Sequence, residues 1–350
     1  MKGYLHMKKT KKQHYVPRCY LENFGVPGTY QINVYDKQSG SSRINSINDV
    51  ASENYFYDVK FSDIFTEDLI KELNGIGVSI DNLDNEQYIE HYLAETIEGD
   101  LSKLLSSIIN KVKSITPWYI QNCFFISEEQ KLNLSVCLAV QYIRTKSVRE
   151  GMLESSDCMQ QALENMNATQ KLKDSMIITK KDLKLIHGKM IFDTDNLFEM
   201  VKSFNSLVWI LGINKTSKHF YTTDNPIGTK AHISHPFLSM GGLNSSGVEA
   251  FFPISPEIIL IMYDGEYHKE LINKDRMYWD NMVHENIEYY NSLAVMRSNR
   301  CVFSDNGDFA LIEEMVKKNP MLFENSNTTE LHWGGNTYRP QKNSKKNSNN

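Results

Sequence analysis

The segment EIILIMYD, residues 257–264, decides the fold class, because its apolar part has the length of a β-strand. Ile258 to Tyr263 are uninterrupted apolar residues, and turn-forming residues bound them on both sides. A run of about four to eight such residues is typical of a strand in a protein core, whereas a membrane helix needs about 18. This run is the best candidate for a membrane span and is too short. We therefore expect a buried strand here and no membrane span.

Other strand-like segments lie towards both ends of the chain. Near the N-terminus, YQINVYD (30–36) and RINSI (43–47) flank the turn sequence KQSGSS, which is the pattern of a β-hairpin. In the C-terminal third, turn-forming pairs such as Asn225-Pro226 separate further predicted strands at 207–213, 219–224, around Phe251–Phe252 and at Cys301–Phe303.

The middle of the chain carries the periodicity of helices. Leucine and isoleucine recur at helical spacing across residues 86–114, and Pro117 ends that helix. Ser127 and Gln130 have the form of a capping box, in which each side chain bonds the other's free backbone N–H group. A second long helix should begin there. Shorter helices are predicted at 17–24, 155–175, 180–190, 194–204 and 274–298.

No linker separates these elements, so we expect one α+β domain over residues 13–330. Its helical middle should pack on a mixed or antiparallel sheet built from the N-terminal hairpin and the C-terminal strands. Residues 1–12 are expected to form a flexible basic N-terminus. Residues 331–350 are rich in Asn and Lys and are expected to form a disordered tail.

The charge is distributed unevenly along the chain. The net charge is −5, but residues 19–330 hold 28 basic and 43 acidic residues, a net of −15. A body this acidic argues against a broad duplex-binding surface, which needs basic side chains. The two basic ends could contact nucleic acid, and solvated tails are the simpler interpretation.

The cysteines favour a reducing compartment. The five cysteines are never closer than 14 residues apart, which excludes CxxC metal or redox spacing and argues against a disulfide scaffold. The basic N-terminus lacks the apolar segment of a signal peptide. We therefore expect a cytoplasmic protein.

The first polar cluster is the opening Gln13-His14-Tyr15-Val16-Pro17-Arg18. His14 directly precedes a predicted helix, whose dipole favours a neutral imidazole or an anionic ligand. Arg18 lies one turn into that helix, and its guanidinium suits a phosphate or a carboxylate. The pattern suggests a proton-transferring histidine beside an anion-binding arginine. The alternative is a structural chain entry with a surface arginine.

The second polar cluster is Gln141, Arg144 and Thr145 on the second long helix. At about 100° per residue these side chains share one face, where Gln141 and Arg144 interrupt an apolar stripe. A partly buried arginine needs a partner, because an unpaired buried charge is too costly. Arg144 would therefore bind substrate, or would form a structural salt bridge to an acid such as Asp224.

The third polar cluster is Thr223-Asp224-Asn225-Pro226, at the end of a predicted strand. Asp and Asn form good turns before proline, which accounts for Asn225. Asp224 is less well explained, because a carboxylate at a strand end beside a core is a common catalytic placement. A single aspartate is only weak evidence for a metal site, but it does not exclude a divalent ion bound at Asp224 as a cofactor.

Established cofactor motifs are absent from the sequence. It has no HExxH spacing, no GxGxxG, no P-loop and no GxSxG elbow. Dinucleotide, ATP and α/β-hydrolase functions therefore have no support.

These residues carry a resemblance to a known family. HYVPRCYLENF (14–24) resembles the opening of the bacterial family described as domain of unknown function 4238. Similar motifs follow in the family's order over roughly residues 12–305, with Cys19 where members often have an aromatic residue. These motifs are VYD (34–36), ASExYFY (51–57), QxxRT (141–145), Trp209, TDNP (223–226), PxSP (253–256) and NxxA (291–294).

The resemblance implies a bacterial anti-phage defence role, because some members of the family are associated with defence. The family motifs coincide with the three polar clusters, so we expect these clusters to converge on one site. The leading hypothesis is an abortive-infection effector, a nuclease- or phosphodiesterase-like hydrolase that acts on nucleic acid or nucleotide phosphates. Its catalytic residues would be His14, Arg144 and Asp224, and its substrate-binding residues would be Arg18, Gln141 and Asn225.

Two alternatives stay open. The same residues could form a non-catalytic module that binds an anionic ligand or a phage protein as a trigger. They could also form a buried polar network that only fixes the fold. The oligomeric state is open in every case.

Overall fold

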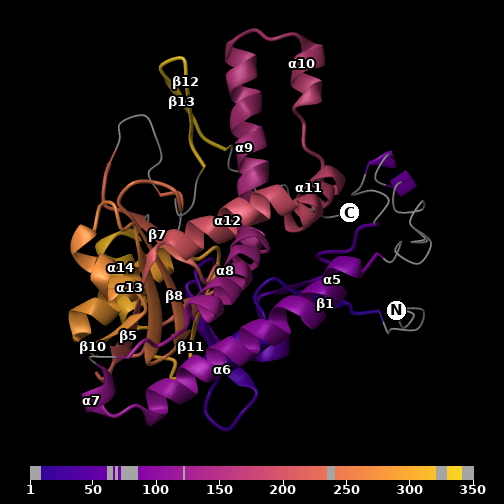
Figure 1. Ribbon diagram of the computed structural model, residues 1–350. Coiled ribbons are helices and arrows are strands. Elements are labelled where there is room, and N and C mark those ends of the chain that lie inside the picture. Colours follow the sequence, from indigo (N-terminus) through magenta and orange to yellow (C-terminus); the bar gives the residue numbers. More distant parts are fainter. Residues whose placement is uncertain are drawn as a thin grey trace.

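The computed structural model describes residues 9–60, 66–67, 70–71, 86–120, 123–234, 241–320 and 329–340. In this part of the chain, helices pack against two principal β-sheets, which is an α+β fold (Figure 1). None of the described helices is long and apolar enough to span a membrane.

The larger sheet has five strands, and the segment EIILIMYD forms its centre. β9 (Ile258–Tyr263) pairs antiparallel with β5 (Val208–Asn214) on one side and β8 (Val248–Ser255) on the other. β7 (Gly228–Ala231) and β10 (Met277–Met282) form the edges, and β10 runs parallel to β5. β5 and β8 are buried along their whole length and β9 along nearly all of it, which confirms the predicted core strand.

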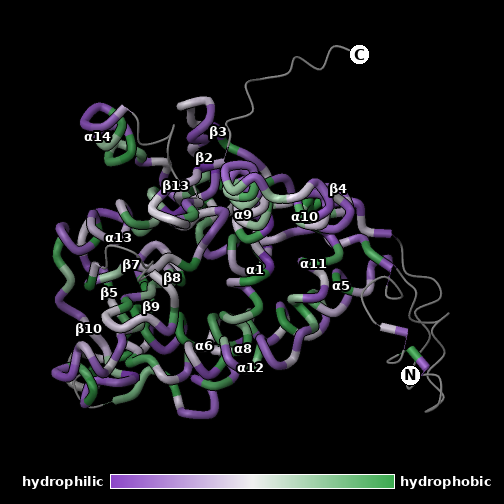
Figure 2. The backbone as a smooth tube through the Cα atoms, turned by 90° about the horizontal axis from the view of Figure 1, so that it is seen from above, coloured by the Kyte–Doolittle hydropathy of each residue, from purple (hydrophilic) through white to green (hydrophobic). Residues whose placement is uncertain are grey.

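Helices cover both faces of this sheet. Trp209, Phe252 and Leu260 point into the main core. They pack there against α6 (Gly99–Ser114), α8 (Glu128–Ile143) and α12 (Thr194–Ser206). On the other face, Phe251 and Ile261 pack against α13 (His284–Arg297). Figure 2 shows hydrophobic stretches on these central strands, between α13 and the group of α6, α8 and α12.

The smaller sheet joins the two ends of the chain, as the sequence predicts. Its order is β3 (Ser41–Ser46), β2 (Gln31–Asp36), β11 (Cys301–Ser304) and β6 (Thr222–Thr223), all antiparallel. α14 (Ala310–Lys318) packs on it through Ile312. A separate ladder pairs β1 (Lys12–His14) with β4 (Ser52–Asn54), next to the short helix α1 (Arg18–Leu21).

The predicted helical middle is confirmed. The Ser127–Gln130 capping box begins α8. The first long helix runs from α5 (Tyr88–Tyr92) through a π-helical segment (Leu93–Glu98) into α6. After α8 come α9 (Lys146–Asn165), α10 (Gln170–Ser175) and α11 (Lys180–Phe192). Figure 1 shows α9 and α10 rising away from the sheets.

Two sequence predictions need correction. The helix predicted over 274–298 begins only at His284, because Met277–Met282 form β10 along the edge of β5. The disordered tail predicted from 331 is wrong for the hairpin of β12 (Leu331–Trp333) and β13 (Asn336–Tyr338). Gly334 and Gly335 supply the positive φ angles of its tight turn, and Tyr338 packs on α9. Residues 1–8 and 341–350 lie outside the described residues.

Candidate functional site

Arg144, at the C-terminal end of α8, is fully buried and makes polar contacts on several sides. Its Nη2 donates to the carboxylate of Glu98 at 2.8 Å and to the backbone carbonyl of His14 at 2.6 Å. Its Nε donates to the hydroxyl of Tyr57 at 3.4 Å, and this hydroxyl donates to the carbonyl of Arg144 at 2.8 Å. A buried guanidinium requires such partners. The acid that pairs with Arg144 is therefore Glu98, whereas the sequence suggested an acid such as Asp224.

The same part of α8 holds the chain opening in place. The side-chain amide of Gln141 donates to the carbonyl of Tyr15 at 3.1 Å. This carbonyl follows directly after the one that Arg144 binds, that of His14. Both bonds reach backbone atoms, not the His14 imidazole. The QxxRT motif thus fixes the backbone of residues 14–15 on α8.

The His14 imidazole is buried and neutral. Burial, and then the charge of Arg18, lowers the pKa of His14 to about 4. Burial raises the pKa of Glu90, on α5, to about 7. Four buried atoms around Arg144 have no hydrogen-bond partner among the described residues: His14 Nε2, Gln141 Oε1, Arg144 Nη1 and Glu90 Oε2. Atoms of this kind are typical binding points for internal water, so the region is a polar network within the fold.

Asp224, directly after β6, is buried and accepts three backbone N–H groups. Its Oδ1 accepts from Asn299 at 2.9 Å, and its Oδ2 accepts from Arg300 and Cys301 at 2.8 Å each. Burial raises the pKa of Asp224 to about 6, and the N–H donors, which favour the carboxylate, limit that rise. N–H dipoles aimed at both oxygens oppose a cation, so Asp224 does not fit a divalent metal. No group of three or more metal-binding side chains lies among the described residues.

Lys37 binds the turn between α13 and β11, which Asp224 also binds. Its ammonium donates to the carbonyls of Val295 at 3.1 Å and Ser298 at 2.8 Å, at the C-terminal end of α13. A cation there stabilises the free carbonyls of a helix end. Burial lowers the pKa of Lys37 to about 8. Together, Lys37 and Asp224 hold the turn between α13 and β11.

The predicted site residues therefore fall into separate places. One group meets beside α8: His14, Gln141 and Arg144. No hydrogen bond or ion pair between described residues joins Asp224 to this group. Arg18 lies at the surface and donates to the side chain of Asn48 at 3.1 Å. Asn225 donates to the carbonyl of Arg297 at 3.0 Å and lines a cavity described below.

A cavity of about 520 Å³ lies between the smaller sheet, the segment that leads into β4 and the start of α9. We call it the main cavity. Segments that carry the family resemblance supply part of its wall, with Tyr15, Val34, Ala51–Glu53 and Asp224. Its charged lining residues are equally basic and acidic: Lys37, Arg43, Lys146 and Arg300 against Asp49, Glu53, Glu150 and Asp224.

Two arginines at this wall share one buried carboxylate. Arg300 donates to both oxygens of Asp36, at 2.9 and 2.6 Å, and Arg43 donates to one of them at 3.1 Å. The bond from Arg300 is the main reason why the pKa of Asp36 falls to about 2. The side chains of Arg43 and Arg300 remain 44% and 51% exposed. We call these three residues the Asp36 cluster; it presents two oriented guanidinium groups with one net positive charge.

Tyr15 brings a hydroxyl group to the main cavity. Its side chain is buried, and its hydroxyl makes no hydrogen bond to another described residue. Burial, and then the charge of Asp224, raises the pKa of Tyr15, so the hydroxyl stays protonated and can donate. Ala51, whose carbonyl accepts the Tyr15 N–H at 3.0 Å, has a φ of 47°, which is uncommon for a residue with a side chain. Such backbone strain clusters at functional sites.

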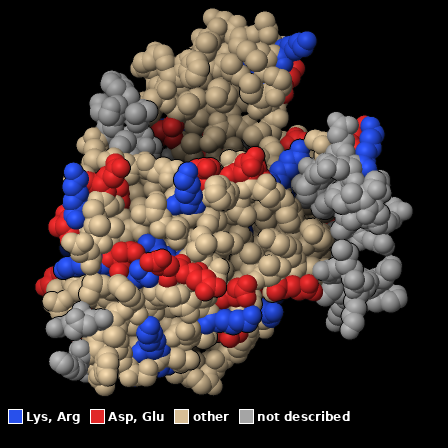
Figure 3. Space-filling model, in the orientation of Figure 1, with Lys and Arg blue, Asp and Glu red and all other residues tan. Residues whose placement is uncertain are grey.

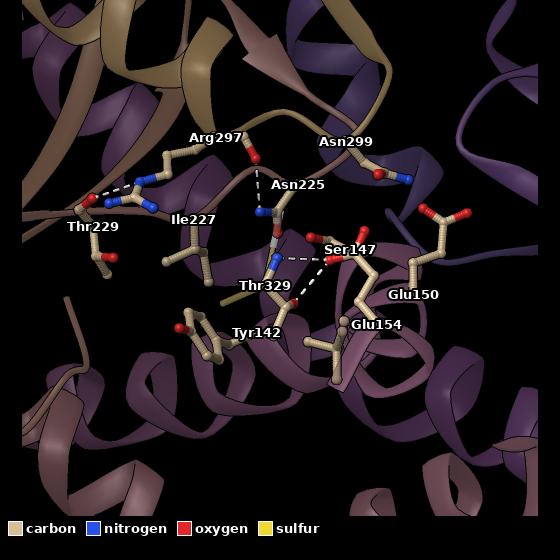
Figure 4. A pocket seen from close by; sticks show the side chains of 12 residues that line it. Tyr142, Ser147, Glu150, Glu154, Asn225, Ile227, Thr229, Arg297, Asn299 and Thr329 are labelled. Carbon is tan, nitrogen blue, oxygen red and sulfur yellow. Dashed lines mark hydrogen bonds between the residues drawn. The ribbon is translucent and has the colours of Figure 1, made fainter. Parts of the chain in front are cut away.

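A second cavity of about 340 Å³ adjoins the first, and we call it the side cavity. Glu150 and Asn299 line both cavities. Figure 4 shows Arg297 turned towards Thr229, whose carbonyl accepts from its Nε at 2.9 Å, with Asn225 between these residues and the start of α9. Asn225, predicted to bind substrate, is therefore placed at a cavity wall.

The sequence clusters did not include the Asp36 cluster. Arg300 is 264 residues from Asp36 in the chain, and only the pairing of β11 with β2 brings them together. No local pattern could join them. The available signal was Asp36 itself, an acid at the end of a strand in the VYD motif.

The family model described as a protein of unknown function, DUF4238, matches residues 12–308. No match was found among the curated proteins or among the solved structures. The matched range contains α8, the Asp36 cluster and every residue named at the main cavity, and it ends before the hairpin β12–β13. The chain belongs to the DUF4238 family of proteins of unknown function.

Proposed function

We propose that the main cavity binds a phosphate group of a nucleotide or nucleic acid strand and hydrolyses a phosphate ester there. The observation that carries this proposal is the Asp36 cluster, in which one buried carboxylate orients Arg43 and Arg300 at the cavity wall. Guanidinium groups match the geometry of phosphate oxygens. Groups that are already oriented also lose less conformational entropy when they bind.

The charge distribution favours a small or single-stranded ligand over a duplex. Acidic and basic side chains are interspersed on the face in Figure 3, without a broad basic surface among the described residues of that face. The main cavity itself carries equal numbers of basic and acidic residues. Duplex binding along the backbone needs a basic surface, so a local phosphate contact fits better.

In the proposed reaction, water attacks phosphorus while the bond from phosphorus to the leaving oxygen breaks. Arg43 and Arg300 would hold the non-bridging oxygens, where negative charge is concentrated. Tyr15 would give its proton to the leaving oxygen. Glu53, which lines the same cavity and pairs with the Lys146 ammonium, would take a proton from the attacking water.

Three of the predicted residues take positioning roles in this proposal. Gln141 and Arg144 hold the backbone that carries Tyr15. Asp224 holds the turn that carries Arg300. His14 lines neither cavity and takes no part in the proposed reaction.

Replacing Arg43 with glutamine is expected to weaken the binding of adenosine monophosphate (AMP) about tenfold in isothermal titration calorimetry. A hydrogen bond to a charged group contributes about 1.5–3 kcal/mol, which sets this magnitude. Arg43 is the suitable target because Arg300 keeps its two bonds to Asp36 in the variant. Lys103→Gln is the matched control, because it removes an exposed cation of α6 outside both cavities.

Measuring hydrolysis distinguishes the proposed enzyme from the non-catalytic binding module. Tyr15→Phe should retain AMP affinity and lose hydrolysis of a nitrophenyl phosphodiester and of single-stranded RNA. A wild type that binds AMP through Arg43 and hydrolyses neither substrate would support the non-catalytic alternative. If AMP and inorganic phosphate both fail to bind, or if Arg43→Gln binds AMP as tightly as wild type, the proposal is wrong.

The anti-phage defence role is also a proposal, and it rests on the family resemblance alone. Cells that express the wild type should give fewer phage plaques than cells that express Arg43→Gln, because the proposed cavity would be needed for protection. Equal plaque numbers for the wild type and an empty vector, over a broad phage panel, would count against this role.

A further inference from the structure

We infer that the side cavity binds the nucleoside part of the ligand whose phosphate the main cavity holds. The inference rests on the proposed function and adds a second subsite to it. The side cavity would recognise ribose hydroxyl groups and amino groups of the base.

The two cavities are placed to share one ligand. Lys146 lines the main cavity, Ser147 lines the side cavity, and Glu150 lines both, so the first turns of α9 form a common wall. From the turn between α13 and β11, Arg300 lines the main cavity and its chain neighbour Asn299 lines both. A ligand with its phosphate at Arg300 therefore meets Asn299 as it extends towards the side cavity.

The polar groups of the side cavity suit a donor-rich, uncharged group. The charged residues that line the side cavity are two acids, Glu150 and Glu154, and one cation, Arg297, whose Nε already donates to a backbone carbonyl. A second phosphate would be repelled there, whereas hydroxyl and amino groups would find acceptors. The amides of Asn225 and Asn299 can both donate and accept.

Tyr142 adds a hydroxyl group and an aromatic ring to the side cavity. Tyr142 lines the side cavity, and its hydroxyl makes no hydrogen bond to another described residue. Ile227 is almost fully buried, so the partly buried ring of Tyr142 provides the apolar surface for the face of a base. The volume of about 340 Å³ lies within the usual range of ligand pockets.

One lining residue of the side cavity, Thr329, lies beyond the family-matched range. Thr329 donates its N–H, at 3.0 Å, and its hydroxyl, at 2.8 Å, to the carboxylate of Glu154. The family match ends at residue 308. Thr329 thus fixes the Glu154 carboxylate at the wall of the side cavity.

The test compares nucleotide with inorganic phosphate in isothermal titration calorimetry on the full chain. The best of the ribonucleoside monophosphates should bind at least about tenfold more tightly than inorganic phosphate, because several hydrogen bonds add to the phosphate contact. Tyr142→Phe and Glu150→Gln should each weaken that nucleotide about three- to tenfold. Tyr142→Phe should leave inorganic phosphate unchanged, because Tyr142 lines the side cavity and not the main cavity. Glu150 lines both cavities, so Glu150→Gln removes a negative charge near the phosphate and should bind inorganic phosphate at least as tightly as the wild type does. Tyr142→Phe removes only a hydroxyl group, so it is independent of the Glu150 contact with Lys146.

Asp157→Asn is the matched control, because Asp157 is exposed on α9 and lines neither cavity. It should leave nucleotide affinity unchanged, and thermal unfolding should show that all variants are folded. If Arg43→Gln weakens nucleotide binding while Tyr142→Phe and Glu150→Gln do not, the side cavity is not the nucleoside subsite and the proposed function stands. If inorganic phosphate binds and no nucleotide binds more tightly, this inference fails and the proposed phosphate site stands. If neither a nucleotide nor inorganic phosphate binds to the wild type, both fail.

Discussion

Replacing Arg144 with alanine is expected to lower the free energy of unfolding by about 3–5 kcal/mol, the usual cost of breaking a buried charge pair. Arg144 is 1% exposed, and its guanidinium binds the carboxylate of Glu98 and the carbonyl of His14. The truncation would leave Glu98 without its cation and would leave a cavity beside Tyr57. Urea unfolding followed by circular dichroism measures the change.

Arg18→Ala is the control for this experiment. Arg18 is exposed, and its described side-chain bond is to Asn48 at the surface. An exposed pair of this kind contributes about 0–1 kcal/mol, so the variant should unfold near the wild-type midpoint. An Arg144→Ala protein as stable as wild type would contradict the positioning role, and loss of activity without loss of stability would restore a catalytic one.

The secondary structure was predictable wherever local pattern and tertiary context agree. The strand Ile258–Tyr263 and the helix opened by Ser127 follow from apolar run length and capping chemistry, which the chain carries locally. Met277–Met282 were misassigned because their strand state depends on the exposed edge of β5. The hairpin after Leu331 was missed because its stability comes from packing on α9, in a segment whose composition suggests disorder.

The candidate site was predictable only in part. Gln141 and Arg144 were identified because they are polar residues that interrupt an apolar stripe. Such a position indicates burial, and both side chains are buried. The sequence could not say that their partners are backbone carbonyls of the chain opening. Asp224 looked catalytic because its partners could not be identified from the sequence. They are three N–H groups of residues 299–301, which approach Asp224 only through strand pairing. Partner identity over such separations is a property of topology.

His187 on α11 should make the protein less stable in acid. Its Nδ1 accepts from Arg149 at 2.8 Å, and an arginine can only donate, so the proton of the neutral ring lies on Nε2 and is donated to the carbonyl of Ile143 at 2.9 Å. Protonation of Nδ1 would place two cationic groups together in a buried site. Burial, and then the charge of Arg149, lowers the pKa of His187 to about 3.

The sign of the pH effect follows from this depressed pKa. Between about pH 6.5 and pH 3 the unfolded chain binds more protons at this histidine than the folded protein does, so stability falls as the pH falls. Between pH 7 and pH 4 the wild type should lose about 3 kcal/mol more than His187→Gln, whose amide can bond to Arg149 and Ile143 without titrating.

The comparison of the two proteins isolates His187 from the other titrating groups. Asp224 and Glu90 have raised pKa values and act with the opposite sign, and His14 acts with the same sign, but all three are present in both proteins. Urea unfolding at several pH values gives the two slopes. If stability falls with pH equally in the two proteins, protonation of His187 must break its contact with Arg149, so that the charged imidazole is tolerated inside the fold.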